Sequence, residues 1–191
     1  ATVCRNQGHD VVLRDLNIEF FHYCKEENID YYSFNGIFDR YRTATDNEVK
    51  HLTNFIDSFC ESEDLTSYDY VLISVFGVST HYFGGLLLSN ISPNRKFKIC
   101  VGGNGAFVSL TGISLHSFAE YYQTRGLIDD YIKVECEESL KLYLTGQPGP
   151  GINNLNDTQI KDLDSLPFPD YSFVDLDKYD YILGEKDIYV E

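Results

Sequence analysis

Apolar residues gather along the chain in short runs that are separated by helical patterns. A continuous apolar run of strand length covers residues 70–76, and shorter apolar pieces lie in the strand-like segments 11–17, 96–101 and 129–134. Such runs are typical of parallel strands that are buried on both faces. The pattern therefore predicts three or four parallel strands, with residues 70–76 as the central strand.

Apolar residues at helical spacing connect these runs. In the clearest case, Thr45 and Glu48 match a capping box, and the apolar residues that follow fall on one face as far as Glu61. A helix end closed by Gly8 opens the chain. A polar, tyrosine-rich stretch over residues 28–45 interrupts the alternation. Further helices are expected over residues 18–25, around residues 86–88, and over residues 114–124 and 138–144.

This alternation predicts an α/β fold, with a Rossmann-like (flavodoxin-like), mostly parallel sheet and helices on both faces. Residues 1–146 are expected to form this domain. The sequence Gln147-Pro148-Gly149-Pro150-Gly151 ends the last helix and is interpreted as an unpacked linker. Residues 147–191 continue as an acidic, ordered extension that lies over a surface. Because a helix opens the chain, we expect a fragment whose first strand is missing.

The charge of the chain argues against two classes of partner. The 191 residues include 15 basic and 30 acidic ones, which gives a formal net charge of −15 at pH 7. This charge opposes attraction to phosphate backbones and anionic membranes, so we expect neither nucleic acid nor a membrane as partner. The hydrophobic content of 43% is too high for a disordered chain, and no apolar run is long enough to span a membrane.

The five cysteines lie far apart in the sequence, and none forms a CxxC pair. An odd number of isolated cysteines argues against a disulfide framework and against a zinc or iron–sulfur site built within this chain. We therefore predict no metal ligands here and a reducing, cytoplasmic environment.

Small and polar residues follow the strands, at the edge where open parallel sheets bind ligands. Glycines let a backbone approach a ligand closely, and hydroxyl groups with free amides hold a phosphodiester without a cationic side chain. The alternative is that these segments are only tight strand-to-helix turns. Neither a dinucleotide fingerprint nor a P-loop is present. We call the segment at the carboxyl end of each strand its exit. In the first exit, that of the strand over 70–76, the candidate binding residues are Ser74, Phe76, Gly77, Val78 and Ser79. In the second exit, that of the strand over 96–101, they are Gly102, Gly103, Asn104 and Gly105.

A third strand exit, Glu135-Cys136-Glu137-Glu138, surrounds one thiol with carboxylates. Neighbouring negative charge disfavours a thiolate, so Cys136 is a poor nucleophile and we predict no catalytic residue. The 5 histidines and 15 tyrosines are interpreted mainly as packing or surface residues. Among the histidines, His81 follows a strand exit closely enough to face the mouth of the site.

The order of several sequence pieces resembles the N-terminal cobalamin-binding domain of cobalamin-dependent radical S-adenosylmethionine enzymes. The last piece is the most specific, because a similar linker joins the cobalamin domain to the radical domain in that family. The resemblance covers nearly the whole chain. The pieces are Ile73-Ser74, Gly102-Gly103, the strand from Asp130 to Val134, Glu137-Glu138, and Leu166-Pro167-Phe168-Pro169-Asp170-Tyr171.

This resemblance implies a domain that holds cobalamin at the carboxyl ends of its strands. The exits Ser74 to Ser79 and Gly102 to Gly105 would line the nucleotide tail, with Glu135, Cys136 and Glu137 nearby. A [4Fe–4S] cluster and S-adenosylmethionine would bind only in a radical domain of the same polypeptide, downstream of residue 191. This chain would then be a binding module, not itself catalytic, of an enzyme that is commonly a methyltransferase.

The chain departs from the family pattern in two places. No DxHxxG motif occurs, so a bound cobalamin would lack the lower histidine ligand, and Cys136 stands where a glycine is usual. Some family members keep the domain without cobalamin, which leaves a cofactor-free scaffold for substrate or partner recognition as one alternative. A flavodoxin-like flavin protein is another, but the chain lacks tryptophan and a Ser/Thr-rich phosphate loop.

Overall fold

The chain divides into two compact units. One combines Ala1–Tyr31 with Asp162–Glu191, and the other consists of Tyr32–Lys161. The sheet lies within the second unit. The computed structural model describes residues 1–38, 43–93, 95–110, 116–133, 137–147, 149, 151–153, 160 and 162–179.

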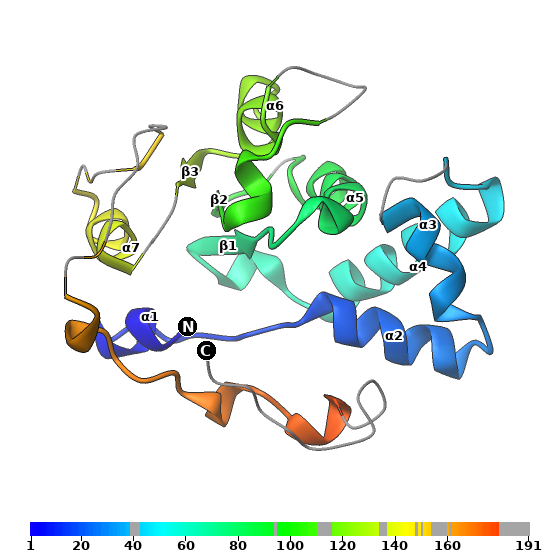
Figure 1. Cartoon of the computed structure of the whole chain (residues 1–191), viewed down its shortest axis with the longest axis horizontal. Coiled ribbons are helices and arrows are strands. Elements are labelled where there is room, and N and C mark those ends of the chain that lie inside the picture. Colours follow the sequence, from blue (N-terminus) through cyan, green and yellow to red (C-terminus); the bar gives the residue numbers. More distant parts are fainter. Residues whose placement is uncertain are drawn as a thin grey trace. The chain divides into compact units, whose positions relative to one another are not determined.

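A parallel sheet of three strands forms the centre of the second unit (Figure 1). The hydrogen-bonded order is that of the sequence, and both neighbouring pairs are parallel. The predicted α/β, Rossmann-like class is therefore confirmed. The strands are β1 (Tyr70–Ser74), β2 (Lys98–Gly102) and β3 (Asp130–Ile132).

The central strand of the described sheet is β2, so the prediction that residues 70–76 form the central strand is wrong. Ile99 and Val101 of β2 are fully buried, whereas Leu72 of β1 is 42% exposed. An apolar run indicates a strand, but it does not show how many neighbouring strands there are. Within the described residues, β1 is an edge strand with one partly open face.

Helices cover both faces of the sheet, as predicted (Figure 1). The helices of this unit are α3 (Asn35–Phe38), α4 (Asp46–Ser62), α5 (His81–Ile91), α6 (Phe118–Thr124) and α7 (Glu137–Leu144), with 3-10 helices at Tyr31–Phe34, Leu65–Ser67, Val78–Thr80 and Asn104–Phe107. On one face, Tyr143 of α7 packs with Cys100 and Ile132. Ile99 and Val101 alternate with Cys100, so they point to the opposite face, on the side of α5 and α6.

The tyrosine-rich stretch after residue 28 contributes to the core. The 3-10 helix at its start runs directly into α3. Phe34 and Ile37 are 0% and 3% exposed. Two apolar anchors within a polar stretch are too few to give a recognisable helical period, which is why the pattern did not predict these helices.

Two capping boxes fix where helices begin. Thr45 pairs with Glu48 at the start of α4, where the sequence predicts it. Ser117 pairs with Glu120, so α6 begins at Phe118, later than the predicted start at residue 114. Hydrogen bonds from the backbone and side chain of Ser117 lower the pKa of Glu120, because they stabilise its charged form.

In the first unit, the predicted strand over residues 11–17 does not form. This segment lies between α1 (Thr2–Asn6) and α2 (Leu16–Glu26). The Asp15 carboxylate accepts hydrogen bonds from the amides of Asn17 and Ile18, and thereby caps α2. An apolar run becomes a strand only beside a partner, and the described residues of this unit include no strand.

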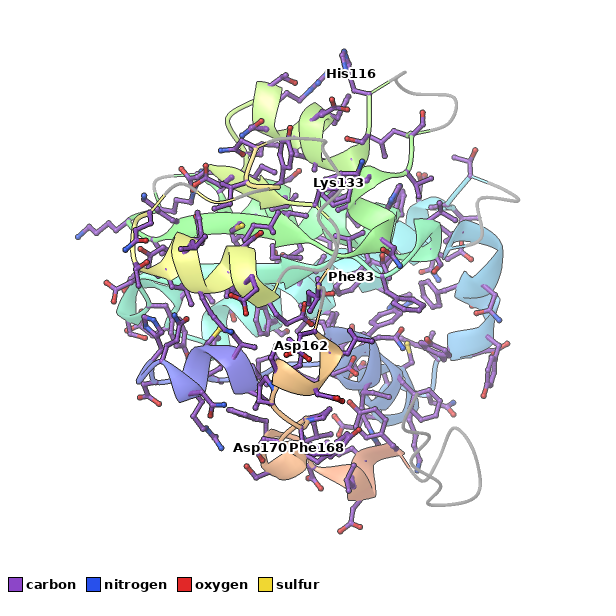
Figure 2. The ribbon with its side chains drawn as sticks, turned by 60° about the vertical axis from the view of Figure 1, so that its left-hand side comes forward. Phe83, His116, Lys133, Asp162, Phe168 and Asp170 are labelled. Carbon is purple, nitrogen blue, oxygen red and sulfur yellow. The ribbon has the colours of Figure 1, made fainter. Side chains whose placement is uncertain are left out.

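In the acidic extension, residues 162–179 are described, and they pack against α1 and α2. Arg5 donates to the Asp170 carboxylate at 2.5 Å, and its guanidinium lies 3.5 Å from the centre of the Phe173 ring. The Tyr179 hydroxyl donates to Asp15 at 2.7 Å. These contacts join the N-terminal helices and the segment that contains Asp170, labelled in Figure 2, into one unit. The extension contains 3-10 helices at Leu163–Ser165, Tyr171–Phe173 and Leu176–Tyr179.

Gly151, at the end of the predicted linker, packs beside the sheet, contrary to the expectation: it is buried, and its carbonyl accepts a hydrogen bond from the Lys133 amide at 3.0 Å. Pro148 and Pro150 lie outside the described residues. Ile152 forms an antiparallel bridge with Ile132, so the segment lines the outer edge of β3. The Asn153 side chain accepts a hydrogen bond from the Tyr131 amide at 3.1 Å and donates one to Asp130. Asn153 has a φ of 49°, a left-handed conformation that asparagine tolerates. Proline and glycine correctly indicate a turn here, but the pairing with β3 depends on distant residues.

We expect Asn153→Ala to lower the free energy of unfolding by about 2 kcal/mol, because the Tyr131 amide and the Asp130 carboxylate lose a partner. Urea unfolding followed by circular dichroism measures this change. Asn90→Ala is the control, since Asn90 is exposed and donates only to Leu86 of its own helix. It should change the free energy by less than about 0.5 kcal/mol. Equal losses would contradict the role assigned to Asn153.

Candidate functional site

The exits of β1 and β2 meet at the carboxyl edge of the sheet and form one surface. The Val75 amide donates to the Gly102 carbonyl at 2.8 Å, and the Gly105 amide donates to the Val75 carbonyl at 2.8 Å. The two predicted binding segments are therefore neighbours, as expected for the ends of adjacent parallel strands.

Two glycines of the second exit are required for packing between the loops. Gly103 has a φ of +89°, and a Cβ added there would lie 2.7 Å from the Val75 carbonyl oxygen. A Cβ on Gly105 would lie 2.6 Å from the Gly77 amide nitrogen. Real Cβ atoms do not approach backbone so closely, so these positions need glycine whether or not a ligand binds.

Gly77 differs from these two glycines. Its φ of −148° is an extended conformation that any residue adopts. A Cβ added there would meet only the Ser79 hydroxyl, at 3.8 Å. Gly77 is therefore the position at which the surface of the joined exits stays open to a ligand.

His81 supports the second exit instead of facing the mouth of the site. It is 3% exposed, and its Nε2 atom lies 2.6 Å from the Gly105 carbonyl oxygen. A carbonyl only accepts hydrogen bonds, so Nε2 donates and carries a hydrogen. The ring also lies 5.0 Å from that of Phe118. The packing interpretation of this histidine is confirmed, and the expectation that it faces the mouth is wrong.

Several polar groups of the exits have no partner within the part of the chain that the structure describes. These groups can bind a ligand that accepts hydrogen bonds, such as a phosphodiester, without any charged side chain. The groups are the backbone amides of Phe76 and Gly77, the hydroxyl groups of Ser74 and Ser79, and the side-chain amide of Asn104.

Both exits lie in stretches without a formal charge. Residues 70–94 and 99–119 contain no Asp, Glu, Lys or Arg, although the chain as a whole has 45 such residues. Apolar side chains on this surface are exposed: Phe76 is 83% exposed, and Val78 and Val108 are 36% and 41% exposed. The sequence analysis missed Val108, and the uncharged stretch was the signal that could have identified it.

The third exit is only partly described. Glu135 and Cys136 lie outside the described residues, and Glu137 stands in the first turn of α7. The structure therefore brings together the first two exits, and the predicted contribution of Glu135 and Cys136 stays a prediction.

Among the described residues, no group of three or more His, Cys, Asp or Glu side chains is arranged to hold a metal ion. No described helix is both long and apolar enough to cross a membrane. Comparisons with protein-family models, with curated proteins and with solved structures found no match.

The buried cysteines are expected to be unreactive. Burial, together with the nearby Asp30 charge, raises the pKa of Cys24 to about 12, so its thiol stays protonated at neutral pH. Burial also raises the pKa of Cys4. Labelling with Ellman's reagent at neutral pH, followed by peptide mapping, should modify the partly exposed Cys60 before Cys4, Cys24 and Cys100. Rapid labelling of Cys24 in the folded chain would contradict this order, and denatured protein is the control.

The two kinds of glycine are expected to differ in stability. Gly105→Ala should lower the free energy of unfolding by about 3 kcal/mol, because its Cβ collides with the backbone of Gly77. Gly77→Ala should change it by less than about 0.5 kcal/mol, since the added Cβ meets open space. Thermal unfolding of the two variants tests this pair. A large loss for Gly77→Ala would show that the exit is more tightly packed than described.

Proposed function

We propose that this chain is the cobalamin-binding module of a radical S-adenosylmethionine enzyme, with the ligand at the joined exits of β1 and β2. The observation that carries the proposal is a set of amide and hydroxyl groups around Gly77 that have no partner among the described residues, within an uncharged part of an acidic chain. The order of sequence pieces from Ile73-Ser74 to Asp170-Tyr171 resembles that family and agrees with this choice.

The residues present suit the nucleotide tail of cobalamin. The tail carries a single phosphodiester charge, which the amides of Phe76 and Gly77 and the hydroxyl of Ser79 can bind by hydrogen bonds. The open space at Gly77 lets the ligand reach these backbone groups. The exposed rings and methyl groups of Phe76 and Val108 offer apolar contact beside them.

When bound, cobalamin would supply a transferable methyl group on cobalt. The part of this chain is to bind and orient the cofactor for a radical domain of the same polypeptide, where the cluster and S-adenosylmethionine are held. No residue of this chain is assigned a catalytic role. We place the enzyme in the cytoplasm, because its cysteines are isolated and the described ones are free thiols.

The second candidate is a cofactor-free scaffold that recognises a substrate or partner for the radical domain. The observation that favours it is the packing of Gly103 and Gly105 against the first exit. These glycines, which the resemblance assigns to the cofactor tail, are needed by the fold alone.

We expect hydroxocobalamin to stay with the purified chain in a stoichiometric amount after desalting. The absorbance spectrum of the desalted protein measures this retention. Gly77→Leu should weaken this binding by at least about tenfold, or about 1.4 kcal/mol, because its side chain fills the open surface above the free amides. Asn90→Leu is the matched control on an exposed helix position and should bind like the wild type.

Circular dichroism separates loss of binding from loss of fold. A folded wild-type chain that retains no corrinoid would reject the cobalamin proposal and favour the cofactor-free scaffold. Equal binding by the wild type and Gly77→Leu would reject the site at the joined exits, although not cobalamin binding itself.

A further inference from the structure

Residues 162–179, which we call the strap, lie against α1 and α2 without any of them being buried. Each residue in this range is exposed or half-buried, and Leu163 and Phe168 are 67% and 92% exposed. Among the described residues, the backbone-to-backbone hydrogen bonds of the strap are local and close short 3-10 turns. Burial of apolar surface is the main force that holds a segment to a domain, so polar side-chain contacts carry a large part of this attachment.

Arg5 of α1 makes most of the polar contacts to the middle of the strap. Its guanidinium group donates to the Asp170 carboxylate at 2.5 Å and to the Ser172 hydroxyl at 3.0 Å. The same group lies 3.5 Å from the centre of the Phe173 ring. An ion pair that is combined with a cation–π contact stabilises more than a single exposed pair does. The Asp170 amide adds a hydrogen bond to the Thr2 hydroxyl at 2.9 Å.

The end of the strap has a second attachment, to α2. The Tyr179 hydroxyl donates to the Asp15 carboxylate at 2.7 Å. The Nε2 atom of His22 lies 2.9 Å from the Lys178 carbonyl oxygen, and it donates because a carbonyl only accepts. The strap is thus held at two places, by α1 in its middle and by α2 at its end.

The helix α2 has contacts of its own that do not involve the strap. Its cap uses the Oδ1 atom of Asp15, whereas Tyr179 binds the Oδ2 atom. The buried ring of Phe20 packs with the rings of Tyr23 and Tyr31, which lie outside the strap. Helix α2 therefore keeps its cap and its aromatic contacts when the strap leaves.

We propose that the strap is a conformational device that opens and closes as one segment while α2 stays folded, with Arg5 as the latch of the closed state. The side chains of Arg5 and Asp170 are 46% and 33% exposed, so dissolved salt reaches and screens their ion pair. Ionic strength thus sets the closed population. The device controls the position of Leu166 to Tyr171, and it does not rest on the proposed function, because all its contacts lie within the first unit.

Hydrogen–deuterium exchange of the full chain, read by mass spectrometry of its peptides, tests the proposal. Arg5→Gln should speed exchange in peptides over residues 162–179 by about tenfold and leave peptides over α2 within about twofold of the wild type. Asp170→Asn should act in the same direction, because it breaks the ion pair from the side of the strap. About 1 M sodium chloride should speed exchange of the strap in the wild type but add little in Arg5→Gln.

Arg125→Gln is the matched control. It removes the same charge and a similar cation–π contact, since the Arg125 guanidinium lies 3.6 Å from the centre of the Tyr121 ring in the second unit. Exchange of the strap should stay as in the wild type. Unchanged exchange in both Arg5→Gln and Asp170→Asn would overturn the latch. Equal acceleration of α2 and the strap would overturn the device, because the strap would then be an integral part of the fold of the first unit.

Discussion

Gly105 packs against the backbone of Gly77 so closely that no side chain fits between them, and the rest of the site depends on this contact. The contact fixes the β1 exit against the β2 exit, and the buried His81 ring supports it by a hydrogen bond to the Gly105 carbonyl. The Gly105 amide donates to the Val75 carbonyl, whereas the neighbouring amides of Phe76 and Gly77 have no partner among the described residues and can bind a ligand. A structural requirement for glycine thus produces the unpaired groups that make the surface a candidate site.

The distribution of charge separates this surface from the remainder of the chain. Thirty acidic side chains lie outside residues 70–94 and 99–119, and these two uncharged stretches supply β1, α5, most of β2 and both exits. In water, an uncharged and partly apolar surface gains by contact with a ligand or a protein, whereas a strongly acidic one gains little from either. The same property therefore underlies the proposed cofactor site at the joined exits.

The first unit rests on a different kind of interaction. Arg5, near the start of the chain, forms an ion pair with Asp170, and its guanidinium group stacks on the Phe173 ring. Ser172 also donates to Asp170, and these bonds lower the pKa of the Asp170 carboxyl. The piece of sequence that resembles a family linker is thus also a structural element, because its aspartate ties the extension to α1. No local pattern predicts this contact, since its partners are separated by 165 positions.

The sequence by itself determined the class of fold and three of the strands, predicted over 70–76, 96–101 and 129–134 and found at 70–74, 98–102 and 130–132. It also determined the start of a helix after Thr45 and the turn after residue 146, because these follow from capping and turn chemistry. It also placed the candidate residues at strand ends, where a parallel sheet brings them together. Only the tertiary structure decided that β2 is central, that Ile152 and Asn153 close the β3 edge, and that residues 11–17 form no strand. It likewise assigned Gly103 and Gly105 to packing and left Gly77 open. These outcomes depend on which distant segments meet, and that choice is made by packing and hydrogen bonding across the chain and not by the properties of any one segment.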